Sequence, residues 1–129
     1  MRKTPTELTP AEWTIIKAVW ESEPCTAPAI QGKLERDTQW SYSTVRTMMD
    51  RMVAKGLLVG KKTGKVTLFS SAVTRDQAQR GELLYTLKNA FNGALTPMMQ
   101  CLLNSGEVSP AELSELEALI KAKKKSAKK

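Results

Sequence analysis

The sequence of 129 residues contains no histidine and only two cysteines, Cys25 and Cys101, which lie far apart. A zinc site needs about four Cys, His or carboxylate ligands at close spacing, so we expect no metal and no cofactor. The sequence also lacks a glycine-rich phosphate loop and a nucleophile–base pair, which argues against an enzyme. We interpret both cysteines as small hydrophobic residues in a reducing compartment, with redox sensing as the alternative.

Long apolar runs are missing too. No stretch approaches the length of a membrane span, and no apolar segment follows the basic start of the chain, Met1 to Pro5. We therefore expect no secretory signal, no membrane contact and a location in the cytoplasm. With 41% hydrophobic and 26% charged residues, the composition is that of a folded chain.

Acidic residues are nearly absent from one internal stretch. Residues 41–69 contain six basic side chains and one acidic one, whereas residues 70–120 contain three basic and six acidic ones. Residues 121–129 add six lysines, which are either a solvated terminus or a non-specific nucleic-acid contact. A net charge of +7 concentrated in this way indicates a polyanionic partner.

Helix caps and β-prone runs define the elements of the N-terminal half. The capping box Thr9–Glu12 begins a helix over about 10–21, Thr26 caps one over 27–36, and Ser41 or Ser43 caps one over 44–55. Two β-prone runs, 57–59 and 66–69, flank the glycine-containing turn 60–65 and predict a hairpin. Three helices followed by a hairpin are the order of a winged helix-turn-helix, whose third helix enters the major groove of DNA.

Three further helices are predicted in the C-terminal half. One spans 75–91, a short one begins at Thr96-Pro97, and the last follows the capping box Ser109–Glu112. The predicted fold class is mainly α with a small β-hairpin. We expect a winged-helix domain over 1–72, a helical dimerisation domain over 73–123 and a basic, disordered tail over 124–129.

The third helix has two different faces at 100° per residue. Its apolar face, which we expect to anchor it to the core, carries Val45, Met48, Met49, Met52 and Val53. Arg and Thr on the outward face are the residue types that contact guanine, thymine methyl groups and phosphates, although a solvated surface helix is the alternative. The DNA-contacting residues predicted for this helix and its cap are Ser41, Ser43, Thr44, Arg46, Thr47, Asp50, Arg51 and Lys55.

Three lysines, Lys61, Lys62 and Lys65, lie in the predicted turn of the hairpin. They would neutralise phosphates if the hairpin is a DNA-binding wing. The alternative is a solubilising turn, because lysines on exposed strands also deter aggregation. Their position next to an arginine-bearing helix favours the wing.

Leucine-rich stripes on the C-terminal helices favour a homodimer, because a segment this short rarely buries them alone. Two-fold symmetry would also place two reading helices on successive turns of a palindromic operator. The predicted interface residues are Leu83, Leu84, Leu87, Phe91, Leu95, Met98, Met99, Leu102, Leu103, Leu113, Leu116, Leu119 and Ile120.

The segments Leu8–Trp13, Val19-Trp20 and above all Trp40–Leu57 resemble the penicillinase-repressor (BlaI/MecI) family. The resemblance implies a winged-helix DNA-binding domain, a C-terminal dimerisation domain and repression of a nearby operon. It places Ser43, Thr44, Arg46, Thr47 and Arg51 on the reading helix, and the three lysines on the wing.

Two departures from the family concern the release of the repressor. Antibiotic-responsive members are cleaved at an Asn-Phe bond, with an upstream sensor protease as partner, whereas Cys101-Leu102 stands at the matching position here. Copper-responsive relatives end in a cysteine-rich tail, but this chain ends in lysines. The inducer is therefore not identified by the resemblance.

A sequence-specific repressor is the leading hypothesis from the sequence. One alternative is a ligand-responsive or architectural winged-helix regulator, and another is a winged-helix protein-interaction module. Salt-dependent binding to duplex DNA would distinguish the repressor and the winged-helix regulator from the protein-interaction module.

Overall fold

The computed structural model describes residues 7–127, and the chain divides into two compact units between Tyr85 and Thr86. The sequence placed this boundary after residue 72. The first unit extends further because Trp20 donates its indole N–H to the carbonyl of Val73, and Ala78 is fully buried. The expectation of no secretory signal at Met1 to Pro5 concerns residues outside the described range.

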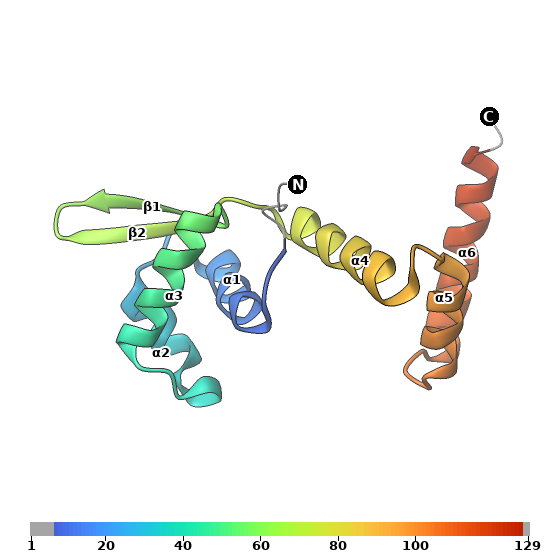
Figure 1. The fold of residues 1–129 in the computed structure, drawn as a ribbon, viewed down its shortest axis with the longest axis horizontal. Coiled ribbons are helices and arrows are strands. Elements are labelled where there is room, and N and C mark those ends of the chain that lie inside the picture. The colour runs from blue at the N-terminus through green and yellow to red at the C-terminus, as the bar shows by residue number, and fades with distance from the viewer. Residues whose placement is uncertain (1–6, 128–129) are drawn as a thin grey trace. The chain divides into compact units, whose positions relative to one another are not determined.

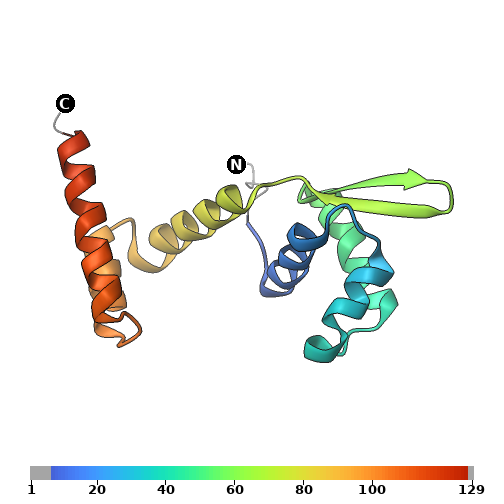
Figure 2. The ribbon, with the colours of Figure 1, turned by 180° about the vertical axis from the view of Figure 1, so that it is seen from behind.

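The first unit contains three helices and a two-stranded antiparallel hairpin in the winged helix-turn-helix order, followed by the first part of a fourth helix. The elements are α1 (Pro10–Ser22), α2 (Ala27–Thr38), α3 (Tyr42–Lys55), β1 (Leu58–Thr63) and β2 (Val66–Ser71). Figures 1 and 2 show the hairpin extending past the three helices, with its turn at the far end. The predicted fold class, mainly α with a small hairpin, is confirmed.

Side-chain caps explain where these helices begin. The Thr9 hydroxyl accepts from the backbone N–H of Glu12 at 3.2 Å, and the Glu12 carboxylate accepts from the N–H of Thr9 at 2.9 Å. Ser41, not Ser43, caps α3 by accepting from the N–H of Thr44 at 3.1 Å, so α3 begins two residues earlier than 44. It ends at Lys55, and the next residue, Gly56, has a φ of 86°, the left-handed conformation that glycine adopts without strain.

The hydrophobic core of the first unit joins all three helices to the hairpin. Ile15, Ile16 and Val19 of α1 pack with Val45, Met49 and Met52 of α3, and with Ile30, Leu57 and Phe69. Met48 is half-buried at the edge of this cluster. The prediction for Val53 was wrong: it is 37% exposed, because α3 presents only a narrow stripe to the core.

The hairpin is longer than the sequence predicted, which moves two of its lysines. Lys61 pairs with Leu68 and Lys62 pairs with Thr67, so both lie within β1 rather than in the turn. Only Gly64 and Lys65 separate the strands, and the φ of Gly64 is 66°, as a tight hairpin turn requires. Consecutive strand residues point to opposite faces, so Lys61 and Lys62 do not share one.

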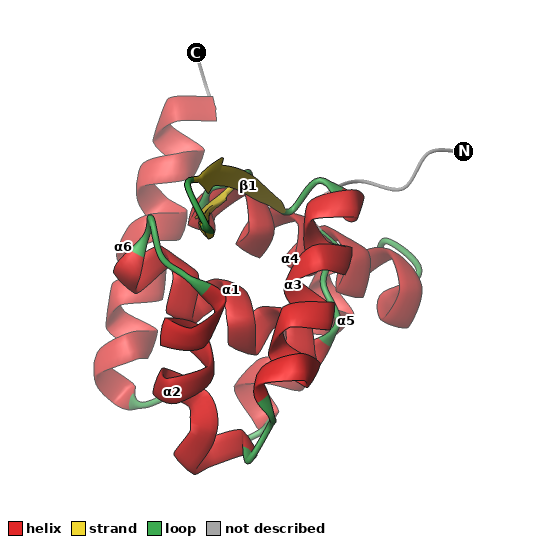
Figure 3. Cartoon of the chain, turned by 90° about the vertical axis from the view of Figure 1, so that its left-hand side faces the viewer, coloured by secondary structure: helices red, strands yellow, loops and turns green. Residues whose placement is uncertain are grey.

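The remaining helices are α4 (Arg75–Phe91), α5 (Leu95–Asn104) and α6 (Pro110–Ala127), and Figure 3 shows helix as the dominant structure outside the hairpin. Ser109 and Glu112 form the predicted capping box. Thr96 does not begin α5, which starts at Leu95 with no side-chain cap. Residues 124–127, expected to be disordered, continue α6, whereas positions 128–129 lie outside the described range.

Little of these three helices is buried. Ala78 is the one fully buried residue of α4, and the described residues of α5 and α6 include none. Over the part of the chain that the structure describes, no helix is both long and apolar enough to cross a membrane. The apolar side chains of the second unit are therefore exposed or half-buried, and none is fully buried among the described residues.

Candidate nucleic-acid interface

The outward face of α3 carries the polar residues that the sequence placed there. Val45, Met49 and Met52 anchor the opposite face in the core. Ser41 Oγ lies 3.1 Å from Thr44 Oγ1 and 3.3 Å from Ser43 Oγ, so hydroxyl groups cluster at the start of the helix. The exposed members of the predicted set on and before this helix are Ser41, Ser43, Thr44, Thr47, Asp50, Arg51 and Lys55.

Arg46 is half-buried and is held by Asp50 and Phe69. Its Nε donates to both carboxylate oxygens of Asp50, at 3.1 and 3.3 Å, one helical turn further along α3. Its guanidinium carbon lies 5.5 Å from the centre of the Phe69 ring, within the range of a cation–π interaction. Tyr42 and Asp50 raise the pKa of Arg46 above its ordinary value by stabilising the charged guanidinium.

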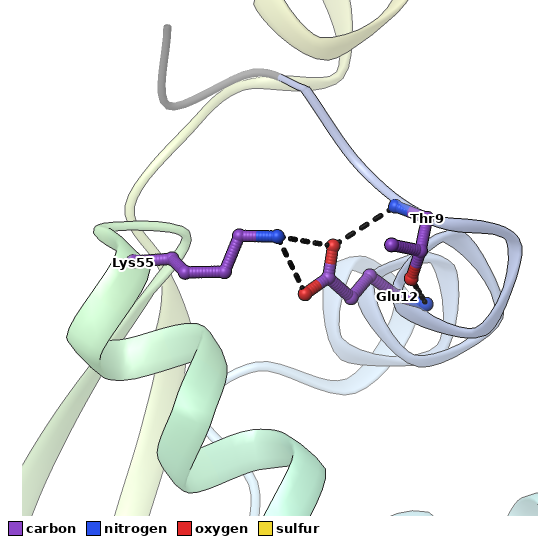
Figure 4. Close-up of polar contacts among 3 residues, drawn as sticks. All are labelled: Thr9, Glu12 and Lys55. Carbon is purple, nitrogen blue, oxygen red and sulfur yellow. Dashed lines mark hydrogen bonds and ion pairs between the residues drawn. The ribbon is translucent and has the colours of Figure 1, made fainter. Parts of the chain in front are cut away.

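Lys55 is tied to α1 (Figure 4). Its ammonium nitrogen lies 2.8 Å from each carboxylate oxygen of Glu12, whose side chain is only 12% exposed. The same carboxylate accepts the N–H of Thr9, so it both caps α1 and holds the last turn of α3. Lys55 was predicted from the sequence to contact DNA, but in the structure its charge is already balanced by Glu12.

The three wing lysines are exposed, and the strand register places them at different positions on the hairpin. Gly60 is the partner of Phe69 and Lys62 that of Thr67, so Lys62 lies on the hairpin face that also carries Phe69. That face is the one on which Arg46 rests. Lys61, the partner of Leu68, lies on the opposite face, and Lys65 is in the turn.

The unbalanced charge of the surface therefore comes from four residues. Arg51, Lys61, Lys62 and Lys65 have no ion pair within residues 7–127, whereas Arg46 and Lys55 each have one. A cationic helix face beside a cationic hairpin is suited to the phosphate backbone of a duplex. In the same part of the chain, no three His, Cys, Asp or Glu side chains lie close enough to hold a metal ion.

All the predicted interface residues of the C-terminal helices are either exposed or half-buried in the single chain. Leu102, Leu116 and Leu119 line one cavity with Val108 and three glutamates, Glu107, Glu112 and Glu115. The half-buried members are Leu87, Phe91, Met98, Met99 and Leu116. The exposed members are Leu83, Leu84, Leu95, Leu102, Leu103, Leu113, Leu119 and Ile120.

Three residues of this surface were missed by the sequence analysis. Tyr42 precedes Arg46 by four positions, and that spacing on a helix could have suggested the contact. Phe69 touches Arg46 only because the hairpin folds back onto α3, and Glu12 meets Lys55 across 43 positions of sequence. No local pattern signals either of these two contacts.

Comparison with known proteins agrees with this architecture. The sequence model described as penicillinase repressor matches residues 8–122, nearly the whole chain. The chain belongs to the penicillinase repressor family. The resemblance of Trp40–Leu57 and its flanking segments to this family is therefore confirmed.

Individual members of the family are distant in sequence but similar in length. The penicillinase repressor of Bacillus licheniformis is 25% identical over 124 residues, which cover 96% of each chain. The methicillin resistance regulatory protein MecI of Staphylococcus aureus is 22% identical over 117 residues, 91% of this chain and 95% of MecI. The solved DNA-binding domain of the repressor BlaI superposes with a TM-score of 0.51 at 27% identity, covering 58% of this chain and 90% of that domain.

Proposed function

We propose that this protein is a sequence-specific DNA-binding repressor that acts as a homodimer on a palindromic operator. The observation that carries the proposal is the surface formed by α3 and the hairpin, in which Arg51 and the three wing lysines have no ion pair among the described residues. Relatives named as penicillinase repressor and methicillin resistance regulator, and the similar fold of the BlaI DNA-binding domain, support it.

In this proposal α3 enters the major groove and the hairpin lies along the neighbouring backbone. Arg46 reads a guanine through two parallel hydrogen bonds, while Ser43, Thr44 and Thr47 contact bases or phosphates. Arg51 and the wing lysines bind phosphates. Lys55 holds α3 in place through Glu12 instead of touching DNA, which revises its predicted role.

The homodimer is proposed because the C-terminal helices leave their leucines uncovered. Residues such as Leu83, Leu95 and Leu119 are each more than half exposed in the single chain. Covering such a set removes a large apolar area from water. Each Å² of apolar area that is buried stabilises the complex by roughly 25 cal/mol. A second copy offers the same stripes, and a two-fold axis is the commonest way to pair them.

Equilibrium binding to duplex DNA at several salt concentrations tests the proposed function. A duplex selected by the protein from random sequences and a shuffled duplex are compared between about 50 and 300 mM salt. We expect the logarithm of the association constant to fall linearly with the logarithm of salt, by about 0.9 for each neutralised phosphate. We also expect the selected duplex to bind at least about a thousand-fold more tightly than the shuffled one.

The alternatives predict different results in the same experiment. Equal binding to both duplexes would identify an architectural DNA-binding protein. An absence of salt-dependent binding to any duplex would overturn the proposal and leave a protein-interaction module.

A further inference from the structure

Asp50 is the one acidic residue in the basic stretch 41–69, and it lies on the outward face of α3. Its side chain is 56% exposed, so burial does not explain its presence. A carboxylate on a surface that meets phosphates repels them, which weakens binding to any duplex. Its position therefore calls for a role other than affinity.

The contacts of Asp50 indicate that role. Both of its oxygens accept from Nε of Arg46, which fixes the inner edge of the guanidinium. The Phe69 ring, itself fully buried, supports the same guanidinium from the hairpin. The side chain is thus held by Asp50 of α3 and Phe69 of β2.

An arginine has five N–H donors, one on Nε and four on the terminal nitrogens Nη1 and Nη2. With Nε engaged by Asp50, the donors left for DNA are on the terminal nitrogens. Two donors at the end of the side chain match the O6 and N7 acceptors of guanine. A fixed guanidinium also has less freedom to swing onto a nearby phosphate, which any sequence offers.

We propose that Asp50 determines sequence specificity by positioning Arg46 for a base edge and withholding it from the phosphate backbone. The inference rests on the proposed DNA-binding function and adds a positioning residue to it. Asp50 increases discrimination between operators while it lowers affinity for DNA in general. Those two effects have opposite signs in one residue, and a merely structural role would not produce them.

Asp50→Asn tests the inference, because it removes the charge and keeps the shape. Affinity is measured for the selected duplex, for its single-base-pair variants and for a shuffled duplex. We expect tighter binding to the shuffled duplex, since one negative charge is lost. We expect discrimination at one base pair to fall by about tenfold, the scale of one lost bidentate contact.

A matched control is present in the same chain. Arg80 and Asp76 of α4 form another exposed pair at the same helical spacing, with 2.8 Å between Nη2 and the carboxylate. Asp76→Asn changes the net charge equally but lies outside the proposed interface, so we expect discrimination to stay unchanged. Thermal unfolding of each variant verifies that the fold persists, since exposed pairs of this kind contribute little to stability.

The double variant Arg46→Ala, Asp50→Asn separates positioning from direct reading by Asp50. If Asp50 acts through Arg46, its substitution has no further effect on discrimination once Arg46 is gone. An equal loss in both backgrounds, or an unchanged base preference in Asp50→Asn, overturns the inference. Failure of the wild-type protein to discriminate between duplexes would instead overturn the proposed function, so the two failures are distinguishable.

Discussion

Lys55 near the end of α3 donates to both carboxylate oxygens of Glu12 in the first turn of α1, each at 2.8 Å. The Glu12 carboxylate also completes the cap of α1 by accepting the N–H of Thr9. One side chain thus fixes the start of the first helix and the end of the third. This contact ties the last turn of α3 to the first turn of α1.

Glu12→Gln should destabilise the first unit modestly. Glutamine still completes the capping box, but it offers Lys55 a neutral partner in place of a carboxylate. We expect a loss of about 1 kcal/mol in the free energy of unfolding for Gln, and about 2 kcal/mol for Glu12→Ala, which also loses the cap. Urea denaturation measures both. In a Lys55→Met background the cost of Glu12→Gln should nearly vanish, and a full cost there would contradict the assigned contact.

Replacing Arg46 or Arg51 with alanine should change DNA binding in different ways. Arg46 is held in one orientation by Asp50 and Phe69, whereas Arg51 is exposed without an ion pair among the described residues. We expect Arg46→Ala to cost about 1–3 kcal/mol on the preferred duplex and to relax preference at one base pair. Arg51→Ala should weaken all duplexes alike. Binding to a panel of single-base-pair variants distinguishes the two, and uniform loss from Arg46→Ala would make it a phosphate contact.

The two lysines of β1 should not contribute equally to DNA binding. Lys62 shares the hairpin face of Phe69, on which Arg46 rests, and Lys61 points to the other face. We expect Lys62→Ala to reduce the slope of binding against salt by about one unit, with base preference unchanged, and Lys61→Ala to reduce it less. The two variants have the same charge, so each is the control for the other. A larger effect of Lys61→Ala would place the opposite face of the hairpin against the duplex.

The local parts of the fold followed directly from the sequence. Capping residues such as Thr9, Thr26 and Ser109 fix helix starts through hydrogen bonds to residues three positions away. A short stretch of sequence is therefore enough to recognise them. The order of helices and hairpin, and the localised positive charge, are likewise properties of the sequence itself. These features were enough to predict the winged helix, whereas the DNA contacts of α3 stay a prediction.

The contacts between helices and strands could not be predicted from the sequence, because they depend on tertiary packing. The sequence pattern placed Lys61 and Lys62 in a turn, since lysine and glycine are common there, but backbone pairing extended both strands past them. The sequence does not distinguish Lys55 from other surface cations, because its partner Glu12 lies 43 positions away in the chain. The orientation of Arg46 depends on Phe69 in the same way. Tertiary pairing therefore decides which cations are available, and composition alone does not.

The two cysteines should differ sharply in reactivity. Cys25 is buried beside Phe69, and burial, followed by the nearby charge of Glu23, raises the pKa of its thiol. Its reactive thiolate form is therefore scarcer at neutral pH than in a free cysteine, and the thiol is also shielded. Cys101 is exposed. We expect a maleimide to label Cys25 at least about tenfold more slowly than Cys101 in the native protein. In urea, we expect both cysteines to be labelled fast. Mass spectrometry of the labelled peptides measures both, and rapid labelling of native Cys25 would contradict its burial.

The second unit should hold two copies of the chain together. Leu119 is 67% exposed on α6, so Leu119→Glu removes little packing within one chain. If the predicted interface is correct, the variant places a charge against apolar side chains of the second copy and dissociates it. Sedimentation at micromolar concentration should find a dimer for the wild type and a monomer for Leu119→Glu.

Val59→Glu is the matched control for this experiment, because Val59 is 53% exposed but lies on the hairpin, outside the predicted interface. It should remain a dimer. Since two linked reading surfaces bind a palindrome more tightly than one, Leu119→Glu should also lose affinity for the full operator while keeping that for a half-site. A wild-type protein that sediments as a well-folded monomer would contradict the homodimer and leave the exposed leucines to some other partner.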